Sequence, residues 1–221
     1  MVFIGILKSE DRSVRQTRFV IRGERYTHTV MRIVGLSGSL RKASVNTGLL
    51  RYCQGVLQQQ HGIELDIVPI QELPLFNEDI ESLGSTESVH AFLERCNPKS
   101  TDGFIFAACE YNGSISAPLK NALDWGSRGG NVFDDKPCAI VGAGGYAGTT
   151  RGQGHLRDIA FNLNMKDMRG GFGSGLEIRL QTTDEPAPFD ADGNLVHDFW
   201  KKMIADKTMP GFVSWINRLK N

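Results

Sequence analysis

Residues 37–47 hold an unusual density of groups that bind anions. Between a short apolar run and an amphipathic pattern lie four hydroxyl side chains and an arginine: Ser37, Ser39, Ser44, Thr47 and Arg41. A helix N-terminus adds unpaired N–H donors and a partial positive charge, and a guanidinium matches phosphate geometry. This density favours a phosphate-binding loop. Asn46 either caps the helix or donates to the anion.

Two well-known loops do not fit this stretch. A Walker A loop needs Gly-Lys-Ser/Thr, which is absent. The serine-hydrolase elbow needs a second glycine two residues after the serine, and Ser39 stands there after Ser37. The remaining alternative is an ordinary strand–turn–helix with Ser and Asn caps.

A second polar stretch, residues 110–116, suits a flat polar ring. Tyr111 has the shape to lie against an aromatic ligand, while Asn112, Gly113 and neighbouring amides have donors for ring carbonyls. A polar loop leading into a helix is the alternative interpretation.

The elements around these stretches alternate between short apolar strands and amphipathic helices. Strands are expected at 32–36, 63–68, 104–109 and 138–141, with a loop over 69–81 and a turn at 192–194. Helical spacing follows each strand and closes the chain through Phe212, Trp215, Ile216 and Leu219. This order predicts one doubly wound parallel α/β domain, whose ligands bind at the carboxyl ends of its strands.

Composition narrows the classes of partner. The 25 Lys and Arg balance the 25 Asp and Glu, which argues against a protein that coats nucleic acid or an anionic membrane. No apolar run reaches the length of a membrane span. Four cysteines without a C-x-x-C pair, and no His at zinc-ligand spacing, indicate free thiols in a reducing compartment and no metal site. We therefore expect a cytoplasmic protein.

Residues 1–30 differ from the rest of the chain, with six Lys and Arg against three Asp and Glu. The apolar run 3–7 is too short for a secretory signal. We interpret residues 1–30 as an extension that is dispensable for residues 31–221. Organellar targeting is the alternative, although the three acidic residues weaken it.

Several separate motifs resemble the NAD(P)H-dependent FMN reductase family, the flavodoxin-like group of quinone, chromate and azo-dye reductases. The motifs occur in order across residues 31–221: 39–46, 73–79, 110–112 with 119–125, 135–137, 151–157 and 189–195. The resemblance implies a flavodoxin-like five-stranded parallel sheet in three layers. It also implies FMN as cofactor, NADPH or NADH as donor, a quinone-like acceptor, and a homodimer or homotetramer.

The resemblance also assigns residues, with the redox chemistry on FMN and no catalytic side chain. The FMN phosphate would lie on Ser39, Leu40, Arg41, Ser44, Val45 and Asn46. The isoalloxazine edge would meet Glu110, Tyr111, Asn112 and Gly113, with Gly144 and Gly145 from the fourth-strand loop. Arg128 and Arg151 are candidates for the NAD(P)H phosphates. His155 is expected to pack, not to catalyse.

Cys109 and the glycine-rich residues 142–147 each have a second interpretation. Cys109 stands where the family usually has proline, so it is either a small strand-end residue or a redox-active thiol. Residues 142–147 match G-x-G-x-x-A, with Asp167 twenty residues on, as in a Rossmann dinucleotide site. Because the motif follows the fourth strand and no convincing strand ends at Asp167, we interpret it as backbone close to a flat flavin.

Three other functions remain open. A reductase that releases reduced FMN would bind FMN weakly. A redox-sensing interaction module would hold FMN without turnover. A single-electron carrier is disfavoured by the arginine in the phosphate loop. In the reductase that keeps its FMN, NAD(P)H and the acceptor would use one exposed face of the flavin in turn, which predicts ping-pong kinetics.

Overall fold

The computed structural model describes residues 16–21, 24–168 and 177–220, and its centre is a parallel β-sheet. The strand order is β10-β8-β5-β3-β4, with β9 pairing beside β8. The strands are β3 (Arg32–Ser37), β4 (Glu64–Ile67), β5 (Gly103–Ala107), β8 (Pro137–Gly144), β9 (Lys166–Asp167) and β10 (Ile178–Gln181). This is the flavodoxin-like strand order, and the expected α/β class is confirmed.

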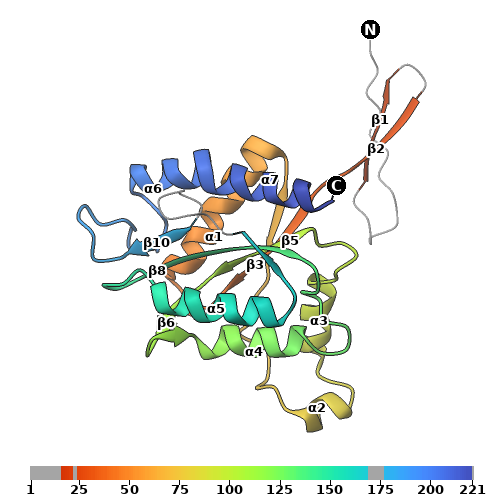
Figure 1. Cartoon of the computed structure of the whole chain (residues 1–221), viewed down its shortest axis with the longest axis horizontal. Coiled ribbons are helices and arrows are strands. Elements are labelled where there is room, and N and C mark those ends of the chain that lie inside the picture. The colour runs from red at the N-terminus through yellow and green to blue at the C-terminus, as the bar shows by residue number, and fades with distance from the viewer. Residues whose placement is uncertain (1–15, 22–23, 169–176, 221) are drawn as a thin grey trace.

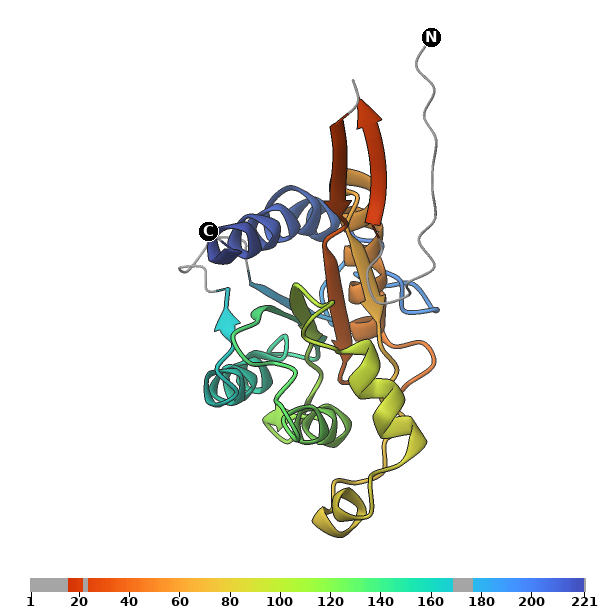
Figure 2. The same ribbon diagram turned by 90° about the vertical axis from the view of Figure 1, so that its right-hand side faces the viewer.

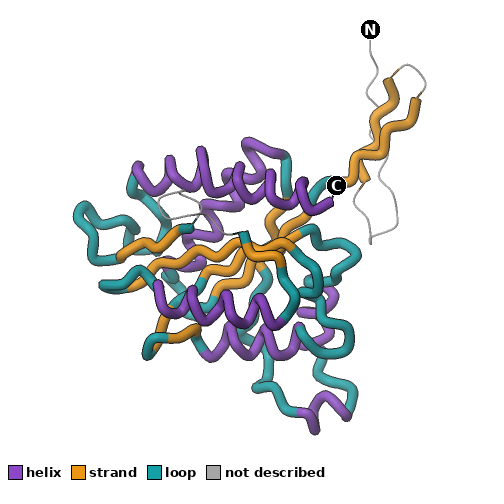
Figure 3. Tube along the Cα trace, viewed as in Figure 1, coloured by secondary structure: helices purple, strands orange, loops and turns teal. Residues whose placement is uncertain are grey.

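Helices cover both faces of the sheet, which gives three layers (Figures 1 and 3). One face packs against α1 (Val45–Val56), α6 (Asp198–Met203) and α7 (Met209–Lys220), and Phe212 and Ile216 are fully buried there. The other face packs against α3 (Glu87–Arg95), α4 (Ala117–Gly126) and α5 (Thr150–Asn162). Every residue of β5 is buried, as its continuous apolar run predicts.

Most expected elements form where the residues predict them. Gly62 ends the first helical region in a left-handed conformation, after a π-helical turn over Leu57–His61. Pro118 lies in the first turn of α4, where its missing N–H costs nothing. Thr86 is the N-cap of α3, but its side chain makes no capping hydrogen bond.

Four features differ from the expectations. The loop over 69–81 contains the start of a short helix, α2 (Glu78–Ser82), which Asn77 caps by accepting from the Asp79 N–H. The stretch 110–116 contains a hairpin, β6 (Glu110–Tyr111) and β7 (Ser114–Ile115). Strand β8 continues into the glycine-rich stretch as far as Gly144. The fifth main strand, β10, forms at Ile178–Gln181, where no strand was expected.

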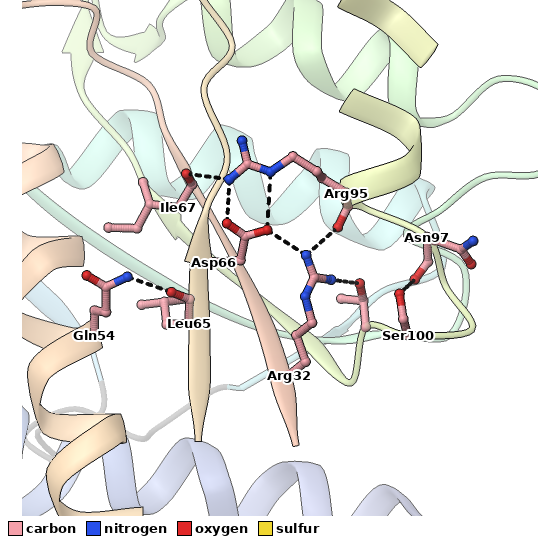
Figure 4. A network of polar contacts seen from close by, with 9 residues as sticks. Arg32, Gln54, Leu65, Asp66, Ile67, Arg95, Asn97 and Ser100 are labelled. Carbon is pink, nitrogen blue, oxygen red and sulfur yellow. Dashed lines mark hydrogen bonds and ion pairs between the residues drawn. The ribbon is translucent and has the colours of Figure 1, made fainter. Parts of the chain in front are cut away.

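An ion-pair network joins α3 to the sheet (Figure 4). The Asp66 carboxylate on β4 accepts from Arg32 on β3 at 2.6 Å and from Arg95 at the end of α3. Arg32 also donates to the Arg95 carbonyl. The network therefore connects three elements through one half-buried carboxylate.

The extension before residue 31 includes an antiparallel hairpin of β1 (Gln16–Ile21) and β2 (Glu24–Thr29). These two strands form a separate sheet and project beyond the α/β body (Figures 1 and 2). Residues 1–15, which carry the apolar run 3–7, lie outside the described residues.

Candidate functional site

Three loops meet at the carboxyl ends of β3, β5 and β8. Their registers align Ser37 with Ala107 and Ala107 with Val141, so the strands end at one edge of the sheet. Each loop is one that the sequence singles out. This edge is where doubly wound sheets bind their ligands.

The first loop is built around the N-terminus of α1. Ser44 is the N-cap and accepts from the Thr47 N–H, while the Thr47 hydroxyl donates to the Ser37 hydroxyl at 2.8 Å. The backbone N–H groups of Leu40 and Lys42 find no acceptor among the described residues. These donors, with the start of the helix, leave the loop ready for an anion.

A cavity of about 390 Å³ opens beside this loop. Ser37, Ser39, Arg41 and Thr47 supply its polar wall, and Leu40 lines it too. Residues 67–71, the last residue of β4 and the four that follow it, line the rest of the cavity. Its volume falls within the range of small-molecule sites.

Asn46 has a different place from the one expected. Its side chain is buried and bonds the Ala143 backbone at both ends, donating to the carbonyl at 2.8 Å and accepting from the N–H at 2.9 Å. Ser44, not Asn46, caps the helix. Asn46 therefore ties the first loop to β8.

The second loop is the hairpin of β6 and β7. Asn112 and Gly113 form its two-residue turn with φ values of 52° and 74°, as a type I′ turn requires. The Glu110 carboxylate accepts from the Gly152 N–H at 2.8 Å, in the first turn of α5. Tyr111 is 59 % exposed, so its ring is free to contact a ligand.

In the third loop, which follows β8, most of the glycines are explained by close contacts with other parts of the chain. A Cβ on Gly142 would lie 2.1 Å from the Thr149 hydroxyl, and one on Gly144 would lie 2.7 Å from the Thr149 methyl. Gly145 faces open space, and the neighbouring Tyr146 is 90 % exposed. Contacts within the chain already require glycine at 142 and 144, whereas nothing within 4 Å requires it at 145. The interpretation that backbone of this loop lies close to a flavin stays a prediction.

The Rossmann alternative fails on the position of Asp167. A short strand, β9, does end there, contrary to expectation, but it pairs with the start of β8 at Cys138. Asp167 therefore lies at the amino edge, opposite the three loops, and pairs with Arg157 at 3.2 Å.

The two arginines proposed for NAD(P)H lie far apart. The side chain of Arg151 passes beside Gly113, at 3.5 Å from the position of a Cβ there. Arg128 follows α4, which returns from the carboxyl edge to the amino edge between parallel strands. It pairs with Glu81 at 2.9 Å and lies over the Phe76 ring. The structure brings only Arg151 to the three loops.

Cys109 lies directly beneath the first loop. Its thiol donates to the Gly38 carbonyl at 3.0 Å, and the Ser116 hydroxyl donates to the same oxygen at 2.5 Å. Burial raises the pKa of Cys109 above that of an ordinary thiol. A protonated, bonded thiol is a poor nucleophile, so the packing interpretation is the one the geometry supports. All four cysteines are buried and free.

The sequence analysis overlooked Thr149 and Gln153. Both are buried, and the Gln153 amide donates to the Thr149 hydroxyl at 3.0 Å and to the Ile178 carbonyl at 2.8 Å. They join the third loop to β10. The one local signal is a pair of polar residues four apart at the start of a helix, which alone predicts no such contact.

In the described part of the chain, no cluster of three or more His, Cys, Asp or Glu side chains is placed to hold a metal ion. Among the same residues, no helix is long and apolar enough to cross a membrane.

Comparisons with known proteins show which family this chain is similar to. The sequence model of the NADPH-dependent FMN reductase family matches residues 31–176. A probable NADPH:quinone oxidoreductase of Oryza sativa subsp. japonica is 44% identical over 170 residues, covering 76% of this chain and 83% of its own. The NADPH:quinone oxidoreductase of Arabidopsis thaliana is 42% identical over 177 residues, covering 79% of this chain and 87% of its own.

A solved structure extends the similarity to the fold. The flavoenzyme NAD(P)H:(acceptor) oxidoreductase from Paracoccus denitrificans superposes with a TM-score of 0.72 at 28% identity. The superposition covers 86% of this chain and 98% of the Paracoccus chain.

Proposed function

Because the chain belongs to the NADPH-dependent FMN reductase family, we propose that it binds FMN and reduces a quinone-like acceptor at the expense of NADPH or NADH. When bound, FMN supplies the hydride and two-electron chemistry. The observation that carries the proposal is the first loop, where hydroxyls, the Arg41 side chain and Leu40, whose N–H has no acceptor among the described residues, line a cavity at the carboxyl edge.

The donor set of this loop fits a phosphate. The Ser39 hydroxyl, the Arg41 guanidinium and the backbone N–H of Leu40 can donate together. Val45 contributes the first N–H of α1, and Ser44 holds that turn by capping it. Asn46 acts as a positioning residue through its two bonds to Ala143.

The other two loops fit a flat ring. Tyr111 and Asn112 present their side chains on the hairpin, and Gly113 makes its turn. Glu110 fixes the hairpin to α5 through the Gly152 N–H. Across the edge, Gly145 leaves room while Gly144 packs on Thr149. Amide donors in such loops stabilise negative charge that develops on a ring edge.

Arg151 is the residue we assign to a phosphate of NADPH or NADH, because it lies beside the hairpin with its side chain exposed. Arg128, paired with Glu81 at the other edge, is not part of this proposal.

The visible spectrum of the purified protein tests the function. After incubation with FMN and removal of the excess, we expect flavin bands at about 375 and 450 nm that bleach on anaerobic addition of NADPH and return with a quinone. Initial rates at varied NADPH and quinone should follow a ping-pong pattern. A colourless protein that refuses FMN would contradict the proposal.

The same experiment separates the alternatives. Bands that bleach but pass through a desalting column with the small molecules would indicate a reductase that releases reduced FMN. Bound flavin that neither NADPH nor NADH reduces would indicate a redox-sensing module or a carrier.

We also propose a homodimer or homotetramer in the cytoplasm. Phe161 on α5 is 82 % exposed, beside a cavity of about 250 Å³ between α4 and α5 that Leu123, Ile159 and Leu163 line. The rest of that lining is polar (Lys120, Asp124, Ser127, Asp158 and Asn162), so it is the exposed aromatic that supports a contact between subunits. Phe199 on α6 is a second exposed aromatic, whereas Phe212 on α7 is core. The buried free thiols support a reducing compartment.

A further inference from the structure

Residues 189–195, here called the strut turn, form a stiff turn near the C-terminal end of the domain. Phe189 and Leu195 bridge its base, and the Asp190 N–H donates to the Asn194 carbonyl at 3.0 Å. The Asp190 carboxylate accepts from the N–H groups of Asp192 and Asn194 and from the Asn194 amide, at 2.8–3.1 Å. One carboxylate thus fixes the whole turn.

The strut turn lies in backbone contact with the start of α1. A Cβ on Gly48 would lie 1.7 Å from the Gly193 carbonyl oxygen, so no larger residue fits there without movement. The approach is equally close from the side of the turn: a Cβ on Gly193, whose φ is +76°, would lie 2.8 Å from the Ala43 carbonyl oxygen. Ala43 lies at the end of the first loop and Gly48 in the first turns of α1. The strut turn therefore packs against the two segments that form the proposed phosphate site.

A side-chain clamp holds this contact together. Arg51, one turn beyond Gly48 on α1, donates to the Asn194 amide oxygen from Nε at 3.2 Å and from Nη2 at 2.8 Å. Its Nη2 also lies 3.3 Å from the Asp192 carbonyl oxygen. Arg51 and Asn194 lie more than 140 positions apart in sequence, so the clamp fastens a distant segment to α1.

We propose that the strut turn is the positioning element for the phosphate of FMN, with Gly48, Gly193 and the Arg51–Asn194 pair as its positioning residues. This rests on the proposed function, since it concerns the same loop. The contacts that place the strut turn are with Ala43, Gly48 and Arg51, at the end of the first loop and in α1. The hairpin and Gly145 are not among these contacts. A displaced turn therefore moves the N–H donors of the first loop and leaves the hairpin and Gly145 in place.

The comparison of FMN with riboflavin isolates that effect, because riboflavin has the same ring and no phosphate. The full chain is stripped of flavin, and the Kd of each flavin is measured by quenching of flavin fluorescence. In Gly48→Ala the FMN Kd should rise at least about tenfold while the riboflavin Kd stays within about twofold. Gly55→Ala is the matched control on α1, because its Cβ would meet nothing within 4 Å; both Kd values should stay unchanged.

A second variant covers the case in which Gly48→Ala does not fold. Asn194→Ala removes an exposed acceptor of Arg51, and the FMN Kd should rise about threefold with riboflavin binding unchanged. Equal weakening of both flavins, or no change in either variant, would overturn the role of the strut turn while the proposed function stands. If the wild-type protein binds FMN no tighter than riboflavin, the phosphate of FMN contributes nothing to binding. That result would contradict the proposed phosphate site and this inference together.

Discussion

At the scale of single residues, Asp66 is a carboxylate whose charge the fold requires. Burial raises its pKa, but hydrogen bonds and charge from Arg95 and Arg32 outweigh burial and bring the pKa of Asp66 below its ordinary value. A lowered folded-state pKa gives stability that is present above the unfolded value of about 3.9 and is lost as the pH falls through the folded value.

Asp66→Asn should therefore lower the free energy of unfolding at pH 7 by about 1–3 kcal/mol, because two guanidinium groups lose their charged acceptor. The difference from wild type should shrink as the pH falls below about 4. Urea unfolding at several pH values measures this. Asp124→Asn, which breaks an exposed pair with Lys120, is the control and should cost less than about 1 kcal/mol. A gap that widens in acid would contradict the role given to Asp66.

At the scale of elements, local patterns predicted what local interactions determine. The apolar run at residues 104–109 predicted β5, and the hydroxyls before α1 predicted a capped helix start. The partner of Asn46 could not be predicted, because Ala143 lies 97 positions away and only the tertiary fold brings it near. Strand β10 is short and alternates apolar residues with Arg179 and Gln181, so parallel pairing with β8 is what defines it.

The hairpin of β6 and β7 was predictable from its turn. Asn-Gly is a strong local signal for a two-residue hairpin. Neither interpretation of residues 110–116, a ring-binding stretch or a polar loop leading into a helix, included a hairpin. The error matters because the hairpin orients Tyr111, whose place on a free loop would vary. A site residue on a paired strand is held more rigidly than one on a loop.

Gly113→Ala should test whether the turn positions the ring and not the phosphate. A Cβ at φ +74° costs about 1 kcal/mol. The free hairpin can relieve this strain by relaxing, and flavin binding must restore the turn, so the Kd should rise about fivefold for FMN and riboflavin alike. This is the opposite of the selectivity expected for Gly48→Ala. Fluorescence titration of both flavins measures it, and Gly154→Ala on α5, where a Cβ meets open space, is the control. A loss restricted to FMN would place the hairpin at the phosphate instead.

At the scale of the whole molecule, the α/β body accounts for the site without the extension. The three loops, the cavity and the strut turn all come from residues 37–195. Among the side chains that the structure describes, both core clusters begin at or after Met31. The β1–β2 hairpin pairs only within itself in the sheets described. We propose that residues 1–30 are a separate extension and that residues 31–221 form the reductase domain.

Residues 31–221 expressed alone should therefore fold, bind FMN with the Kd of the full chain, and keep its melting temperature within about 2 °C, since no main-sheet strand is lost. Light scattering should give both proteins the same subunit number, two or four, against a full-length monomer of 24.4 kDa. The α4–α5 groove proposed for subunit contact survives the truncation, so assembly should survive as well. A truncated chain that stays monomeric while still binding FMN would assign the β1–β2 hairpin to assembly. One that loses FMN would make the extension part of the domain.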